Sequence, residues 1–146
     1  MFKTILLAFD GSDHAQNALV IAAGLAKAHD AALHVVHCPQ VDTPPIVIGS
    51  YVSLLETPPT PQQIAEAAQH IADKAAAEAK AEGVELAKVH LGTGAPAAFV
   101  LSTAEQLNAD LIVLGRRGLG SLGALALGSV SQAVSHGAKC ACLTVV

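Results

Sequence analysis

The segment that decides the fold is ADLIVLGRRGLGSLGALALGSV, residues 109–130. It begins with a short apolar run typical of a buried strand, Leu111–Leu114, and a helix is expected to start at Ser129. Five of the 12 glycines of the chain lie between these elements, from Gly115 to Gly128. A glycine-rich connection between a strand and the amino end of a helix gathers free backbone N–H groups, which attract phosphate. The segment therefore predicts an α/β fold with an anion site at this edge of a sheet.

Four further apolar runs resemble this strand, at Thr4–Phe9, Leu33–Cys38, Val84–Leu91 and Cys142–Val146. The segments with helical spacing lie between them, at Asp13–His29, Pro61–Glu82, Pro96–Leu107 and Ser129–His136. Strands that alternate with helices predict a parallel sheet buried on both faces. We expect one three-layer, Rossmann-like α/β domain over residues 1–146. Local patterns predict helix caps at Ser12 or Asp13, with Gln16 completing a capping box, and at Ser129 with Gln132.

Composition and charge exclude several classes of protein. The 146 residues are 52% hydrophobic but only 3% aromatic, so the core must be aliphatic and rich in alanine. A net charge of −4 and the lack of a basic stripe argue against a nucleic-acid binder. No apolar run approaches the roughly 20 residues of a membrane span, and the first residues do not resemble a signal peptide. Three cysteines, an odd number, argue against a disulfide framework, so a cytoplasmic location is expected.

The glycine cluster contains three spacings that resemble phosphate-binding patterns. Gly118-x-Gly120-x-x-Gly123 matches the dinucleotide fingerprint, but it lies late in the chain and no acidic residue follows it. Gly123-x4-Gly128-Ser129 resembles a Walker loop that lacks its lysine. The third pattern is Gly-x2-Gly-x9-Gly-Ser, and the chain matches it at every position, as Gly115-x2-Gly118-x9-Gly128-Ser129.

With this spacing, and with the opening ILLAFDGS of residues 5–12, the whole chain resembles the universal stress protein family, specifically its ATP-binding branch. Residues 33–37, 109–118, 128–131 and 140–145 carry further parts of the resemblance. It implies strand order 3-2-1-4-5. It also implies ATP, with Mg or Mn, as the ligand, and a homodimer paired through the last strand. Ala141 stands where the family often has proline, which puts the detailed geometry of that pairing in question.

The resemblance also implies the residues that contact the nucleotide. Asp10 would lie by the ribose and base, and the backbone near Cys38 would face the adenine. The residues implied along the ribose and phosphates are Gly115, Gly118, Gly128 and Ser129. The same segments complete the expected set with Ala8, Phe9, Arg116 and Val130.

Several alternatives stay open at this point. Asp10 also suits a turn with Gly11 and Ser12, and Arg116 and Arg117 also suit a solvated loop. The long connection Pro39–Pro59 fits an ordered surface loop, a ligand lid or a partner contact.

Metal and catalytic sites receive little support from the sequence. The seven histidines show no metal-ligand spacing, and His34 and His37 are expected on opposite faces of a strand. No catalytic triad or carboxylate pair is evident. A nucleotide-binding stress or regulatory module that is not an enzyme, with a regulatory protein partner left open, is therefore expected. The alternative is a weak nucleotide-hydrolysing or nucleotidyl-transferring enzyme of related fold.

Overall fold

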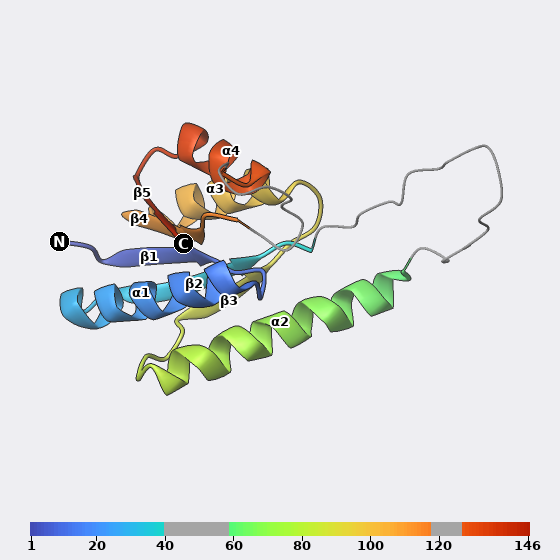
Figure 1. Cartoon of the computed structure of the whole chain (residues 1–146), viewed down its shortest axis with the longest axis horizontal. Coiled ribbons are helices and arrows are strands. Elements are labelled where there is room, and N and C mark those ends of the chain that lie inside the picture. The colour runs from blue at the N-terminus through green and yellow to red at the C-terminus, as the bar shows by residue number, and fades with distance from the viewer. Residues whose placement is uncertain (40–58, 118–126) are drawn as a thin grey trace.

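The computed structural model describes residues 1–39, 59–117 and 127–146. Five strands form one parallel sheet in the order β3-β2-β1-β4-β5, as expected (Figure 1). The strands are β1 (Thr4–Ala8), β2 (Ala32–His37), β3 (Lys88–Leu91), β4 (Leu111–Gly115) and β5 (Ala141–Val145). The order places β1 at the centre, with its carboxyl end between those of β2 and β4.

Four helices cover the two faces of this sheet. They are α1 (Asp13–His29), α2 (Pro61–Ala81), α3 (Pro96–Leu107) and α4 (Ser129–Gly137). Helices α1 and α2 pack on one face, and α3 and α4 pack on the other, which confirms the three-layer arrangement (Figure 1). No helix among the described residues is long and apolar enough to cross a membrane.

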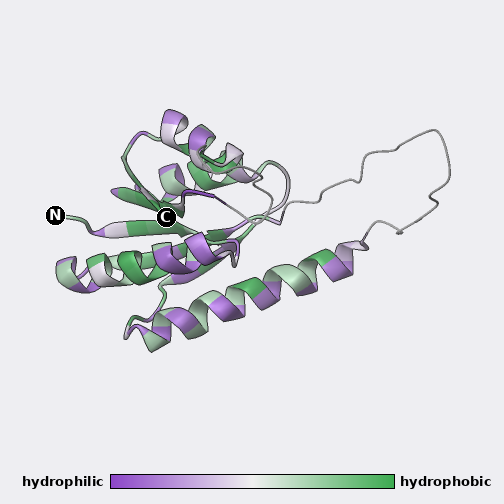
Figure 2. Ribbon diagram, viewed as in Figure 1, coloured by the Kyte–Doolittle hydropathy of each residue, from purple (hydrophilic) through white to green (hydrophobic). Residues whose placement is uncertain are grey.

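The core is aliphatic because strand residues alternate between the two helix layers. Ile5 and Leu7 of β1 face α1 and α2, whereas Leu6 faces α3 and α4. Figure 2 shows the strands as mainly apolar and α2 as alternating bands of polar and apolar residues. The α2 side chains buried against this core are all alanine, at positions 68, 72, 75 and 79. This spacing follows one face of a helix, and the small side chains allow its backbone to approach the rest of the core closely.

The helix starts differ in part from the sequence expectation. Ser12 caps α1, and its Oγ accepts a hydrogen bond from the N–H of Ala15 at 3.2 Å. The side chain of Gln16 lies 3.5 Å from the Gly11 carbonyl oxygen, so the capping box expected for Asp13 and Gln16 is wrong. A capping box does form at α2, between Thr60 and Gln63.

The expected cap at α4 is also wrong, because the N-cap residue is Gly128 and it makes no side-chain cap bond. Ser129 is instead the first residue inside the helix. Its backbone N–H therefore belongs to the group of amides that lack partners within the helix.

Strand β3 is shorter than the apolar run that predicted it. The N–H of Val84 bonds to the Ala79 carbonyl after a glycine, Gly83, with a φ of 76°, so Val84 belongs to the turn that ends α2. Val84 and Leu86 pack against the core although they lie outside the strand. Their burial, rather than strand pairing, explains the apolar pattern.

Candidate functional site

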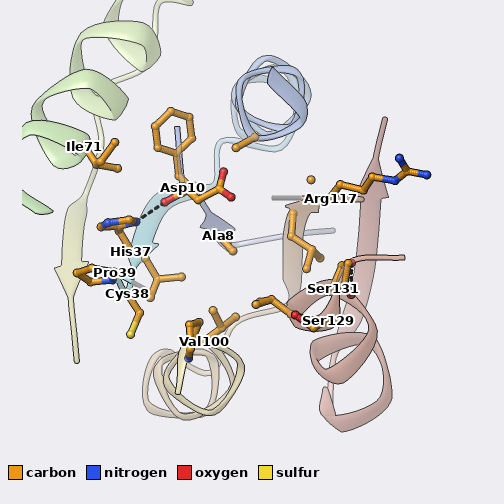
Figure 3. Close-up of a pocket in the computed structure, with 18 of the residues that line it drawn as sticks. Ala8, Asp10, His37, Cys38, Pro39, Ile71, Val100, Arg117, Ser129 and Ser131 are labelled. Carbon is orange, nitrogen blue, oxygen red and sulfur yellow. Dashed lines mark hydrogen bonds between the residues drawn. The ribbon is translucent and has the colours of Figure 1, made fainter. Parts of the chain in front are cut away.

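A cleft of about 620 Å³ opens at the carboxyl ends of β1, β2 and β4 (Figure 3). In an open α/β sheet, ligands bind at this edge where neighbouring strands connect to opposite faces. Eight of the residues expected to contact a ligand line the cleft: Ala8, Phe9, Asp10, Cys38, Gly115, Gly128, Ser129 and Val130. Gly118 lies outside the described residues.

Asp10 directly follows β1 and has a turn-forming role as well as a place in the cleft. Its Oδ1 accepts hydrogen bonds from the backbone N–H of Ser12 at 3.0 Å and from the Ser12 hydroxyl at 2.6 Å. The same Ser12 hydroxyl oxygen caps α1. The two roles considered for Asp10 are therefore compatible, since the turn holds the carboxylate in a fixed position on the wall of the cleft.

His37 is a cleft residue that sequence reasoning did not select. It is only 8% exposed, and its Nδ1 lies 2.8 Å from the carbonyl oxygen of Phe9, as the dashed line in Figure 3 shows. Burial lowers the pKa of His37, while the Phe9 carbonyl and the negative charge of Asp10 raise it in partial compensation. The neutral ring donates its Nδ1–H to Phe9, which leaves Nε2 as a hydrogen-bond acceptor.

Gly115 lines the cleft, but the fold itself explains why this residue is glycine. A Cβ at this position would lie 2.9 Å from the carbonyl carbon and the Cβ of His14, and 3.0 Å from the nitrogen of Ala15. The end of β4 therefore lies against the first turn of α1, and any side chain would push the two apart. This close packing accounts for Gly115 without any need for a ligand to approach its backbone.

The amino end of α4 is tied to the end of β4. The N–H of Gly128 donates to the carbonyl of Arg116 at 2.8 Å, and the Ser131 hydroxyl lies 2.8 Å from the same oxygen. These contacts hold Ser129 and Val130 on the wall of the cleft. The free amides and the positive end of the helix dipole favour an anion at this place.

The two arginines differ from the sequence expectation. Arg116, the expected ligand contact, is not among the lining residues. Its backbone N–H bonds to the Val145 carbonyl of β5, and its carbonyl accepts from the N–H of Gly128 at the start of α4. Arg117 is the arginine among the lining residues, but Figure 3 shows its side chain extending toward β5 and away from the other labelled residues. A bound phosphate would therefore depend chiefly on backbone amides.

The opposite half of the cleft is apolar. It receives side chains from β2, α2 and α3 that the sequence pattern did not assign to a site, including Val36. Figure 3 shows two more of them, Ile71 and Val100. Helical periodicity marks such residues as core, and only the packing of α2 and α3 around the strand ends shows that they also face a cleft. The walls suit a flat apolar group such as a nucleobase, held by aliphatic contacts rather than by aromatic stacking.

The chemistry of the described lining residues gives limited support for a metal. Asp10 is the sole acidic residue among them, and no group of three metal-ligating side chains occurs anywhere in the described residues. A hard divalent cation needs several oxygen ligands, and Mg²⁺ usually takes them from one or two carboxylates, waters and substrate phosphates. The described lining residues therefore fit a metal only as an ion that arrives with a phosphate ligand, whose oxygens and bound waters would supply most of its coordination.

Comparison with known proteins shows what the chain as a whole is similar to. The sequence profile of the universal stress protein family matches residues 1–145. A universal stress protein of Thermus aquaticus is 43% identical over 146 residues, which cover 99% of each chain. The Bacillus subtilis universal stress protein YxiE is 32% identical, again with 99% of each chain covered. A universal stress protein solved in complex with cAMP is 26% identical, with a TM-score of 0.72 and coverage of 99% of this chain and 96% of that one.

Proposed function

The chain belongs to the universal stress protein family, and we propose that it binds ATP, together with Mg²⁺ or Mn²⁺, in the cleft and acts as a nucleotide-responsive stress module rather than as an enzyme. The relative solved in complex with cAMP supports an adenine nucleotide as the class of ligand. The choice of ATP rests on the glycine spacing Gly115-x2-Gly118-x9-Gly128-Ser129.

One feature of the cleft carries this proposal: a single cavity joins an apolar half to the amino end of a helix (Figure 3). Val36, Ile71 and Val100 would hold the adenine, and the amides at Ser129 and Val130 would hold the phosphates. Asp10 lies between these halves in Figure 3, where its carboxylate would accept hydrogen bonds from the ribose hydroxyls.

The divalent ion would supply positive charge at the phosphates, because the side chain of Arg117 extends away from the other labelled residues of the cleft (Figure 3). Phosphate oxygens and water would make up most of its ligands, since Asp10 is the sole carboxylate among the described lining residues. We expect Mg²⁺ to increase ATP affinity more than AMP affinity, because a divalent ion would offset the larger negative charge of a triphosphate.

The test of nucleotide binding compares two variants that each add one negative charge to the first turns of α4. Ser129→Asp places a carboxylate at the first helical position, where it stabilises the helix but repels a phosphate. Gln132→Glu adds the same charge at an exposed residue that does not line the cleft. Isothermal titration should show saturable binding of ATP with Mg²⁺ to the native chain, at least about tenfold weaker binding to Ser129→Asp, and little change in Gln132→Glu.

Titrations with AMP and cAMP, together with an assay of phosphate release, separate the binding module from the enzyme. Saturable ATP binding without sustained phosphate release supports the proposal. Multiple turnovers would favour the alternative of a weak nucleotide-hydrolysing enzyme. The absence of measurable binding of all three nucleotides would contradict both.

The proposed working state is a cytoplasmic homodimer joined through β5. This strand forms an edge of the sheet, so one side of its backbone has no partner strand among the described residues. The three cysteines are free, which suits a reducing compartment. A regulatory protein that recognises the nucleotide-bound form would complete the proposed module.

A further inference from the structure

Two histidines from neighbouring strands meet outside the nucleotide cleft. The Nδ1 atom of His34, on β2, lies 3.2 Å from the Nε2 atom of His90, on β3. Their ring centroids are 5.4 Å apart, with 32° between the ring planes. Both side chains are partly exposed, and neither residue lines the cleft.

The strand register explains this contact between residues 56 positions apart in sequence. Val36 pairs with His90 and His34 pairs with Lys88, so the two histidines are diagonal neighbours on one face of the sheet. Val36 packs in the cluster beneath α3 and α4, and His34, two residues earlier, shares its face. The hydrogen-bonded strands thus hold both imidazoles in place before any ligand binds.

The charge state of the pair suits metal coordination. Burial is the main cause that lowers the pKa of His34 and of His90. The positive charge of Lys88 lowers both pKa values further, and the neighbouring His34 also lowers that of His90. Both imidazoles therefore hold a proton less readily than a free histidine, and the neutral ring is the form in which an imidazole nitrogen donates its lone pair to a metal.

The distance between the two nitrogen atoms also matches coordination. Imidazole nitrogens bind Zn²⁺ at about 2.0–2.1 Å, so two of them on one ion lie roughly 3 Å apart. A direct hydrogen bond between the rings would use the same two atoms at a similar separation. In that case one of the two contact nitrogens carries a proton, and a metal binds both nitrogens only after that ring changes tautomer and carries the proton on its other nitrogen.

We propose that His34 and His90 form a binding site for a divalent transition metal ion of the imidazole-preferring class, such as Ni²⁺, Cu²⁺ or Zn²⁺, at the β2–β3 edge of the sheet. Water completes the coordination, because the described residues hold no third histidine, cysteine or carboxylate in the group. The site does not depend on the proposed nucleotide function, since its residues lie outside the cleft.

The test is an isothermal titration of the full-length chain, without an affinity tag, with Ni²⁺ in a buffer that does not chelate metals. We expect one ion per chain, and at least about tenfold weaker binding in His34→Ala and in His90→Ala. His70→Ala is the matched control, because His70 is an exposed histidine on α2. The affinity of this variant for Ni²⁺ should equal that of the native chain.

Lys88→Gln tests the site without removing a ligand. It takes away the positive charge next to both histidines, so Ni²⁺ should bind several-fold more tightly. In NMR spectra of the native chain, sub-stoichiometric Ni²⁺ should broaden the imidazole signals of His34 and His90 before those of His29 and His70. The proposal is overturned if no one-to-one binding occurs up to about millimolar Ni²⁺, or if both alanine variants keep the native affinity.

Discussion

At the scale of the residue, Asp10 has a structural role and a proposed ligand-binding role that one substitution can separate. Asp10→Asn keeps an Oδ1 atom that accepts the bonds from Ser12, but it removes the negative charge. We expect the variant to stay folded and to bind ATP about tenfold more weakly, because a hydrogen bond to a charged group contributes about 1.5–3 kcal/mol. Isothermal titration measures the affinity, and thermal unfolding checks that the turn is intact.

A second ligand identifies the contact that Asp10 makes. The native chain should bind 2′-deoxyATP more weakly than ATP, whereas Asp10→Asn should distinguish the two nucleotides less. An equal preference for ATP in both proteins would contradict a contact between Asp10 and the ribose 2′-hydroxyl.

His37 makes stability depend on pH. Because burial holds its pKa in the folded protein below about 6.5, its usual value, the unfolded chain takes up a proton more readily. Its contribution to stability is fully present above about pH 6.5 and is lost as the pH falls toward and below the pKa of the folded state. The free energy of unfolding should therefore decrease between pH 7.5 and pH 5.

His37→Asn is the variant that tests this assignment. The asparagine amide can still donate to the Phe9 carbonyl but does not titrate. The free energy of unfolding of the variant should depend less steeply on pH than that of the native chain. A residual slope should remain, because the pKa values of His34 and His90 are lowered too. Urea unfolding at several pH values, with a chelator present, gives the two curves. Identical slopes would mean that His37 is not the titrating group.

At the scale of the element, the two glycines at the ends of the connection from β4 to α4 should differ in how well they tolerate a side chain. Gly115→Ala would force a Cβ within 2.9 Å of the α1 backbone, so we expect a loss of about 1–3 kcal/mol in stability. A Cβ at Gly128 would lie 3.4 Å from its nearest neighbours, and φ there is −62°, so Gly128→Ala should cost only about 0.5 kcal/mol. Chemical unfolding of both variants measures the contrast, and equal losses would contradict it.

Most helix and strand positions could be predicted because their causes are local. Helix α1 spans the expected Asp13–His29, and α2 begins at the expected Pro61. Strand β3 was predicted too long because Val84 is apolar for a different reason, the packing of the turn that follows α2. A periodic pattern reports burial, and it does not distinguish a strand from an extended segment that covers the core.

The site residues divide in a similar way. Asp10 and Ser129 could be predicted because each lies where a strand or a helix meets the sheet edge. His37 was missed because its role depends on the Phe9 carbonyl, which follows another strand, β1. Arg116 was expected to contact the ligand, but Arg117 is the arginine that lines the cleft, and the packing of the strand end against α4 and β5 decides which of the two neighbours faces it. Such contacts between distant segments leave no signal in residue spacing.

At the scale of the whole molecule, the open edge of β5 is the surface on which the proposed dimer depends. The carbonyl of Val145 accepts from the N–H of Arg116, so the backbone groups of Val145 face the rest of the sheet. Neighbouring residues of a strand direct their N–H and C=O groups to opposite sides, which turns those of Thr144 outward. Thr144→Pro therefore removes an outward N–H and leaves the pairing with β4 in place, a substitution that an edge strand tolerates.

We expect Thr144→Pro to weaken the homodimer strongly while the monomer stays folded. Light scattering after size-exclusion chromatography should give twice the chain mass of 14.7 kDa for the native protein and the mass of one chain for the variant. Thr103 lies on α3, away from this edge, so Thr103→Ser serves as a control. It keeps the hydroxyl that donates to the carbonyl of Phe99. A native protein that elutes as a monomer, or a variant that remains a dimer, would mean that the chain does not associate through β5.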